Sequence, residues 1–166
     1  MCIRDSINLM EFLVKETAIK FTLKCEALYE QILHFSAAHG EIGIIDHLAK
    51  KGIRLELSDQ FGRTPLHWAS QNGYFDMVNY LTKKNVNLEI KDNYGDTPLH
   101  LATRNNFLRI VVFLIDHGVH VETKNKMGVT PLYVASRNGH LDMVKYLIGK
   151  NATIEANNDS GSTPLH

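Results

Sequence analysis

Apolar and polar positions along the chain follow a pattern that returns every 33 residues. In each period, a short segment with small and apolar residues at helical spacing, such as Leu66, Ala69 and Ser70, precedes a longer segment with the pattern of an amphipathic helix. The longer segments align in one phase: Met77, Val78 and Leu81; Ile110, Val111 and Leu114; Met143, Val144 and Leu147. The pattern therefore predicts pairs of helices, one short and one longer, stacked on copies of themselves.

The predicted short helices share a start signal, the four-residue box Thr-Pro-Leu-His. The box stands at Thr64–His67 and returns at residues 97–100, at 130–133 with Tyr for His, and at 163–166. A Thr hydroxyl accepts a hydrogen bond from an unpaired backbone N–H at a helix start, and Pro is favoured at the first helical position. Gly or Asn, which favour the left-handed conformation that ends a helix, follow the predicted helices at Gly73, Asn85, Asn106, Gly118 and Asn151.

A predicted tight turn precedes each box. The segment Asp59-Gln60-Phe61-Gly62 has Asp in the first position and Gly in the fourth, which is typical of a type I turn. The same arrangement returns at residues 92–95, 125–128 and 158–161, with Asn for Asp in the last two. The repeating unit is therefore a turn, a short helix, a second turn, a longer helix and a loop.

The four boxes, the Gly two residues before each Thr and the Val-x-x-Leu pairs of the longer helices together resemble the ankyrin repeat. The resemblance implies an all-α ankyrin-repeat solenoid of stacked helix-turn-helix units, with β-turn or hairpin loops that project at a right angle. It also implies that the chain binds other proteins. The resemblance covers an ankyrin-repeat domain at residues 31–166, which we divide into units 31–63, 64–96, 97–129 and 130–162 and a truncated unit 163–166.

The N-terminal part departs from the pattern. Gln31-Ile32-Leu33-His34 replaces the box, so we expect the first short helix to have a less well fixed start. Residues 7–15 align with residues 42–50, which predicts the second helix of an earlier, partial repeat, followed by a variant loop over residues 16–30. The alternative for this N-terminal segment, residues 7–30, is an unrelated amphipathic helix that caps the stack.

The two ends of the chain also differ from a complete repeat array. Residues 1–6, Met-Cys-Ile-Arg-Asp-Ser, resemble the translated end of a transposon used to prepare sequencing libraries, and we interpret them as a sequencing or cloning scar. The alternative is a native start with a polar cap before the first helix. The chain stops within the first helix of a fifth unit, whereas repeat arrays need polar terminal units to stay soluble. We therefore expect a fragment of a longer protein.

Composition narrows the class of partner. The 166 residues have a formal net charge of zero, which gives no electrostatic basis for binding nucleic acid or an acidic membrane. No apolar run is long enough to span a bilayer. Cys2 and Cys25 are too few for a disulfide framework and favour a reducing, cytoplasmic compartment. We expect a monomer.

The nine histidines form no recognisable catalytic or metal-binding motif. We expect His67 and His100, and His166 in the last box, to bond the turn backbone and tie one unit to the next. His117 and His120 have no third ligand at a familiar spacing. Because the sequence also has no phosphate-binding loop and no nucleophile in a known motif, it predicts no enzyme, no cofactor and no metal.

The turns supply the first set of candidate binding residues. Phe61, Tyr94 and Met127 share one phase and would form an apolar column at the turn tips, which suggests a contact surface. The alternative is that each of these side chains packs on the neighbouring turn and only stiffens the array. The turns also contribute the candidate partner-binding residues Arg63, Asp96 and Val129.

A second set ends the short helices and should line the concave side near the tips: Gln71, Arg104 and Arg137. Arg104 and Arg137 could meet a carboxylate on a partner; the alternative is that they are solvated helix ends. We therefore predict a protein-binding scaffold or adaptor that holds a partner through its loop tips and concave face. The alternatives are the recognition arm of a larger enzyme or channel whose working domain lies outside this chain, and a passive spacer.

Overall fold

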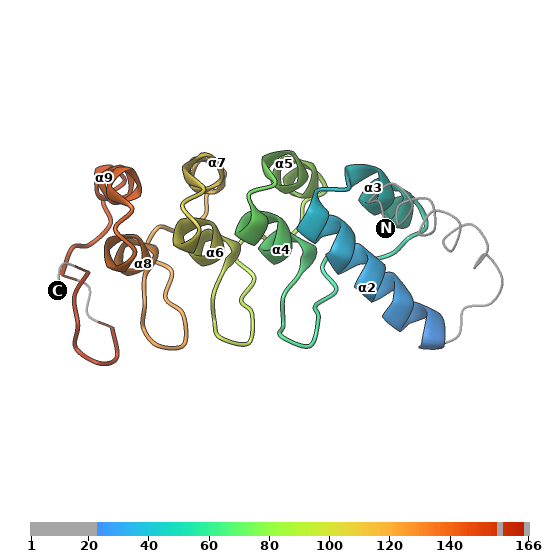
Figure 1. Cartoon of the computed structure of the whole chain (residues 1–166), viewed down its shortest axis with the longest axis horizontal. Helices are drawn as coiled ribbons and strands as arrows, with labels where there is room; N and C mark the ends of the chain where they lie inside the picture. Colours follow the sequence, from blue (N-terminus) through green and yellow to red (C-terminus); the bar gives the residue numbers. More distant parts are fainter. Residues whose placement is uncertain (1–22, 156–157, 165–166) are drawn as a thin grey trace, which may run out of the picture.

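The computed structural model describes residues 23–155 and 158–164, and the helices in this part form two layers (Figure 1). The first layer holds α2 (Leu23–His39), α4 (Pro65–Asn72), α6 (Pro98–Arg104) and α8 (Pro131–Arg137). The second holds α3 (Ile42–Lys50), α5 (Phe75–Lys83), α7 (Leu108–Asp116) and α9 (Leu141–Gly149). None of these helices combines the length and apolar composition that a membrane crossing requires.

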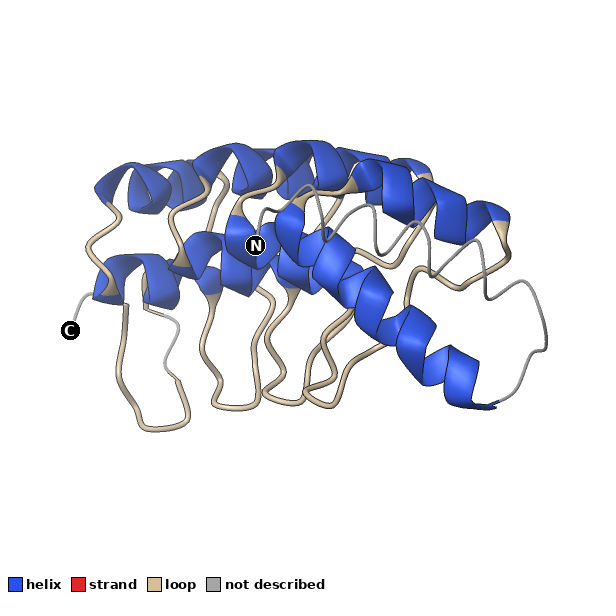
Figure 2. Cartoon of the chain, turned by 45° about the vertical axis from the view of Figure 1, so that its right-hand side comes forward, coloured by secondary structure: helices blue, strands red, loops and turns tan. Residues whose placement is uncertain are grey.

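The helices pair along the chain, and each pair contacts the next. In the first layer α2 packs on α4, α4 on α6 and α6 on α8, while each of these helices also packs on its second-layer partner. Hairpin-like loops project from the side of the first layer, and the described residues contain no strand (Figure 2). The predicted all-α solenoid of stacked helix pairs is confirmed.

The core lies between the two layers. Its members include the second-layer residues that share one phase, all of them completely or almost completely buried: Met77, Val78, Leu81, Ile110, Val111, Leu114, Met143 and Leu147. Small residues of the first layer, such as Ala69 and Ala102, are also fully buried and allow close helix packing. Because each pair buries its apolar face against its neighbours, the stack has one continuous core.

The box fixes the start of α4 through side-chain to backbone contacts. Thr64 adopts the extended conformation, and Pro65 is the first helical residue. The Thr64 N–H donates to Nδ1 of His67 at 3.1 Å, and the Thr64 hydroxyl lies 2.9 Å from the same nitrogen. Thr97 and His100 repeat both contacts at the start of α6. The predicted start signal is therefore a reciprocal capping box with His in place of the usual Glu.

The predicted helix ends are confirmed by their backbone conformation. Each residue named as a stop has a positive φ angle: Gly73 (81°), Asn85 (58°), Asn106 (61°), Gly118 (90°) and Asn151 (66°). Asn is among the few residues other than Gly that adopt this region at low cost. The ends of both helices in each regular unit therefore follow from single residues in the sequence.

The N-terminal expectation needs a correction. Residues 23–30, expected within a variant loop, are helical and belong to α2, which continues to His39. Gln31 and Ile32 stand where Thr and Pro stand in the other units, so no Pro interrupts the backbone ladder and the helix continues toward the N-terminus. Residues 1–6, which we interpreted as a scar, and residues 7–15, which we expected to form a helix, lie outside the described residues.

Candidate functional site

The projecting turns are built around one side chain each. Oδ1 of Asp59 accepts hydrogen bonds from the backbone N–H groups of Phe61 and Arg63, both at 2.9 Å. The Gly62 N–H closes the turn on the Asp59 carbonyl at 2.9 Å. Asp92, Asn125 and Asn158 repeat this arrangement in the following turns. Asp and Asn are equivalent here because the turn uses only the side-chain oxygen.

Successive turns are joined by backbone hydrogen bonds. Asn93 N–H donates to the Phe61 carbonyl (2.9 Å), Lys126 to Tyr94 (3.0 Å) and Asp159 to Met127 (3.1 Å). Gly62 has a φ of 74°, and a Cβ added there would lie 2.9 Å from the Asn93 nitrogen. Only Gly therefore meets both the conformation and the close approach at this position. The row of turns has its geometry fixed by these bonds.

The tips of these turns carry exposed apolar side chains. Phe61 is 44% exposed, Tyr94 57% and Met127 61%. Their backbone carbonyls take part in the inter-turn bonds, so the three side chains are held at a constant spacing along the stack. We call this set, Phe61, Tyr94 and Met127, the tip column.

The histidines of the boxes tie one unit to the next, as predicted. Nε2–H of His67 donates to the Asp96 carbonyl at 3.1 Å, and that of His100 donates to the Val129 carbonyl at 3.0 Å. Burial lowers the pKa of His67 and of His100 below the ordinary value of 6.5. Both imidazoles are therefore neutral at pH 7, with Nδ1 as acceptor and Nε2–H as donor. His166 lies outside the described residues.

The placement of Asp96 and Val129 corrects the prediction that their side chains meet a partner. Both residues are buried, at 4% and 9% exposure. Asp96 accepts hydrogen bonds from Arg104 (2.7 Å) and from the Asn125 amide (2.8 Å). Asp96 follows the tight turn at residues 92–95 and bonds the end of the short helix that comes next, while Asn125 of the neighbouring unit bonds it from the other side. These side chains support the surface and do not form it.

Arg63 is also held within the structure. Its Nη1 donates to Oε1 of Gln71 at 2.9 Å, and its guanidinium lies 5.2 Å from the centre of the Trp68 ring. Its Nε is 3.5 Å from Oδ2 of Asp92 in the following turn. Arg63 and Gln71 thus bond each other. Arg104 is paired with Asp96, and these two residues are also eight apart in the sequence. Of the predicted basic residues, Arg137 alone has no such partner among the described residues.

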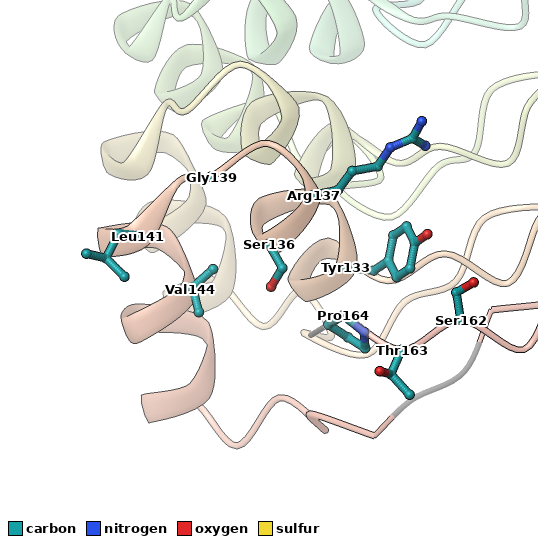
Figure 3. Close-up of a pocket in the computed structure, with 9 residues that line it drawn as sticks. All are labelled: Tyr133, Ser136, Arg137, Gly139, Leu141, Val144, Ser162, Thr163 and Pro164. Atoms are coloured by element: carbon teal, nitrogen blue, oxygen red, sulfur yellow. The ribbon is translucent and has the colours of Figure 1, made fainter. Parts of the chain in front are cut away.

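Arg137 and Tyr133 lie at two adjoining cavities. One cavity of about 280 Å³ lies between the units at residues 97–129 and 130–162, and a larger one of about 670 Å³ lies beyond α8; both residues line both cavities. Their side chains project from α8 toward the same side (Figure 3). The sequence analysis did not select Tyr133, although the exchange of His for Tyr in the third box was a visible signal.

A model of a known protein family matches this chain. The family model described as ankyrin repeats in three copies matches residues 1–92, 33–125 and 84–158. The matches overlap and together extend over residues 1–158. A comparison with curated proteins gives no match.

Proposed function

This chain belongs to the ankyrin-repeat family, and from that premise we propose that it binds one protein partner through the tip column and the adjoining face of α4, α6 and α8. Ankyrin repeats are generally protein-interaction modules. The observation that carries the proposal is the tip column, three apolar side chains exposed in one row on bonded turns. Aromatic residues and Met are enriched at protein interfaces.

The rigidity of the turns supports this use of the tip column. Each turn is closed by its Asp or Asn side chain and bonded to the next turn through the backbone. A partner therefore meets a surface that is ordered before contact, and little conformational entropy is lost on binding. Rings and thioethers held in this way act as anchors when they enter a partner's pocket.

The proposal assigns no catalysis to the chain. Ankyrin repeats are typically non-catalytic, and the part of the chain that the structure describes holds no group of three residues able to hold a metal ion. We propose that the scaffold acts as a monomer in the cytoplasm. The low cysteine content supports the reducing compartment. A purified chain that turned over a substrate after stringent repurification would contradict this assignment.

The test is the triple variant Phe61→Ser, Tyr94→Ser, Met127→Ser. A random peptide library displayed on phage is panned against the wild-type chain, and the affinity of the selected peptides is measured for both proteins. We expect the variant to keep its far-UV circular dichroism and to lose about 2 kcal/mol or more of binding free energy for each anchor.

The matched control is Ile148→Ser with Ile154→Ser. Both side chains are apolar and exposed, at 37% and 38%; Ile148 lies on α9 in the second layer and Ile154 in the loop that follows α9. We expect the control to bind like the wild type. Equal affinity of the wild type and the triple variant would contradict the proposed binding surface, and loss of helical signal in the triple variant would show that the tip column is structural.

A further inference from the structure

Arg137 differs from its counterparts because the residue that would pair with it has been replaced. In each regular unit, the last residue of the turn faces the end of the short helix eight residues later: Arg63 bonds Gln71, and Asp96 bonds Arg104. The third such pair is Val129 and Arg137. A Val side chain accepts no hydrogen bond, so the Arg137 guanidinium has no partner among the described residues.

Tyr133 departs from the pattern in the same unit. His67 and His100 are completely buried and bond the carbonyl of the next turn. Tyr133 takes their place in the box, but it is only half-buried and lines the cavities beside Arg137. The two residues are four apart on α8, a spacing that puts them on one helix face. The structure gives the Tyr133 hydroxyl no hydrogen-bond partner among the described residues.

No acidic residue is among the described residues that line the two cavities around these side chains. We call the smaller cavity the Arg137 groove. Its lining residues are Arg104, Asn125, Met127, Val129, Tyr133, Val134, Arg137 and Asn138. The carboxylate beside it, Asp96, is already bonded to Arg104 and Asn125. The charge of Arg104 is thereby neutralised, while that of Arg137 is not.

The chemistry of the groove selects a planar acceptor with an apolar neighbour. A guanidinium presents parallel N–H donors that match the two oxygens of a carboxylate, and a phenol O–H can donate to the same group. Met127 supplies an exposed apolar wall next to these donors. Met127 is also part of the tip column, so the groove continues the proposed binding surface.

We propose that the Arg137 groove receives the side-chain carboxylate of an aspartate or glutamate in the partner, with an adjacent apolar side chain of the partner against Met127. The proposal rests on the proposed function and names the chemistry of the partner segment. The occupant is a side chain within a peptide segment; a phosphate group or a free chain terminus is a different ligand, which the test separates.

The test uses the same random peptide library, fused ahead of the coat protein so that the displayed segment carries neither a phosphate nor a free carboxyl terminus. It is panned separately against the wild type, Arg137→Gln and the control Arg54→Gln, which removes an exposed arginine far from the groove. We expect Asp or Glu beside an apolar residue among the peptides selected by the wild type and by Arg54→Gln. We expect this preference to vanish with Arg137→Gln.

Affinities of one selected peptide, synthesised with an amidated end, then measure the contact itself. Replacing its acid by the amide, or Arg137 by Gln, should each weaken binding about tenfold or more, the usual size of a hydrogen bond to a charged group. Because the two changes remove the same contact, the double change should weaken binding no further than either one. Losses that multiply would overturn the proposal.

A second variant, Val129→Asp, restores the pairing found at Asp96 and Arg104. We expect the new carboxylate to bond Arg137 and to reduce the affinity for the acidic peptide as Arg137→Gln does, while circular dichroism stays unchanged. Peptides whose affinity depends on Phe61 and Tyr94 but not on Arg137 would overturn the groove proposal and leave the proposed function standing. A wild-type chain that selects no peptide at all would contradict the proposed function itself.

Discussion

The helices α2 and α4 pack against each other in the first layer, yet they start in different ways. The first residue of α4 is Pro65, immediately after Thr64, whereas α2 already includes Leu23, well before the matching residue Ile32. The segment from Leu23 to Gln31 contains no Gly and no Pro. The difference shows that the box stops a helix from extending backward as well as capping it.

The presence or absence of the box also changes which backbone carbonyl accepts a hydrogen bond from the histidine at its fourth position. His67 and His100 donate to the last carbonyl of the next turn, at Asp96 and Val129. His34 donates instead to the Leu57 carbonyl at 2.8 Å, and not to that of Arg63, the equivalent residue. Without Thr and Pro to set the helix start, the imidazole has a different direction. The box therefore determines both where the helix begins and which carbonyl ties the units together.

We expect core substitutions to give the largest difference in stability between the first helix pair, α2 and α3, and the regular pairs. Leu114 and Leu48 are both fully buried and occupy the same phase. We expect Leu114→Ala, in the middle of the stack, to cost about 2–5 kcal/mol of unfolding free energy and to lower one common transition. Leu48→Ala, in the pair without the box, should instead separate an early transition of α2 and α3 from the rest.

Trp68, the single tryptophan, reports this difference because it lies in α4. In urea, circular dichroism should change before Trp68 fluorescence in Leu48→Ala, and the two signals should coincide in Leu114→Ala. Coincident curves for Leu48→Ala would show that the first pair is as tightly coupled to the stack as the regular pairs. An unchanged midpoint in Leu114→Ala would contradict the assigned core.

A smaller effect should come from the box histidines. His100→Ala leaves the buried Thr97 N–H without its partner and removes one of the two hydrogen bonds at the Val129 carbonyl, which still accepts from the Asn125 N–H. This change should cost roughly 1–3 kcal/mol. His34→Ala removes one bond to Leu57 and should cost about 1 kcal/mol. Urea unfolding followed at equilibrium gives both values.

His120→Ala is the matched control for these histidine variants. Its side chain is 80% exposed and pairs only with Glu89, so the change should stay within about 0.5 kcal/mol of the wild type. If His34→Ala proved as costly as His100→Ala, the comparison drawn between the two kinds of helix start would fail.

The smallest effect on stability should come from restoring a stop in α2. Gln31 is exposed, and Gln31→Pro removes one helical N–H and clashes with the preceding turn. We expect residues 23–30 to leave the helix, seen as Cα chemical shifts that move to coil values, while the Trp68 midpoint stays close to that of Gln31→Ala. A fall of about 3 kcal/mol, the usual cost of Pro inside a helix, would instead show that the N-terminal turns are integral to the stack.

The regular units show how far sequence reasoning extends. The helix starts, the positive-φ stops, the turns and the exposed tip column depend on residues within one unit, so their spacing was enough to predict them. The helical conformation of residues 23–30 was missed because the loop expected there was inferred from alignment with other units. Asp96 was misplaced because its burial depends on Asn125, which belongs to the next turn.

The sequence by itself therefore determined the period, the helix pairs, the caps and the core phase, since local backbone preference and apolar spacing set all of these within about 33 residues. The tertiary structure decided which polar side chains remain available. Arg104 is neutralised and Arg137 is not, because the residue that faces each of them is Asp96 in one unit and Val129 in the other. That pairing depends on how each turn folds back onto its helix, and only packed units reveal it.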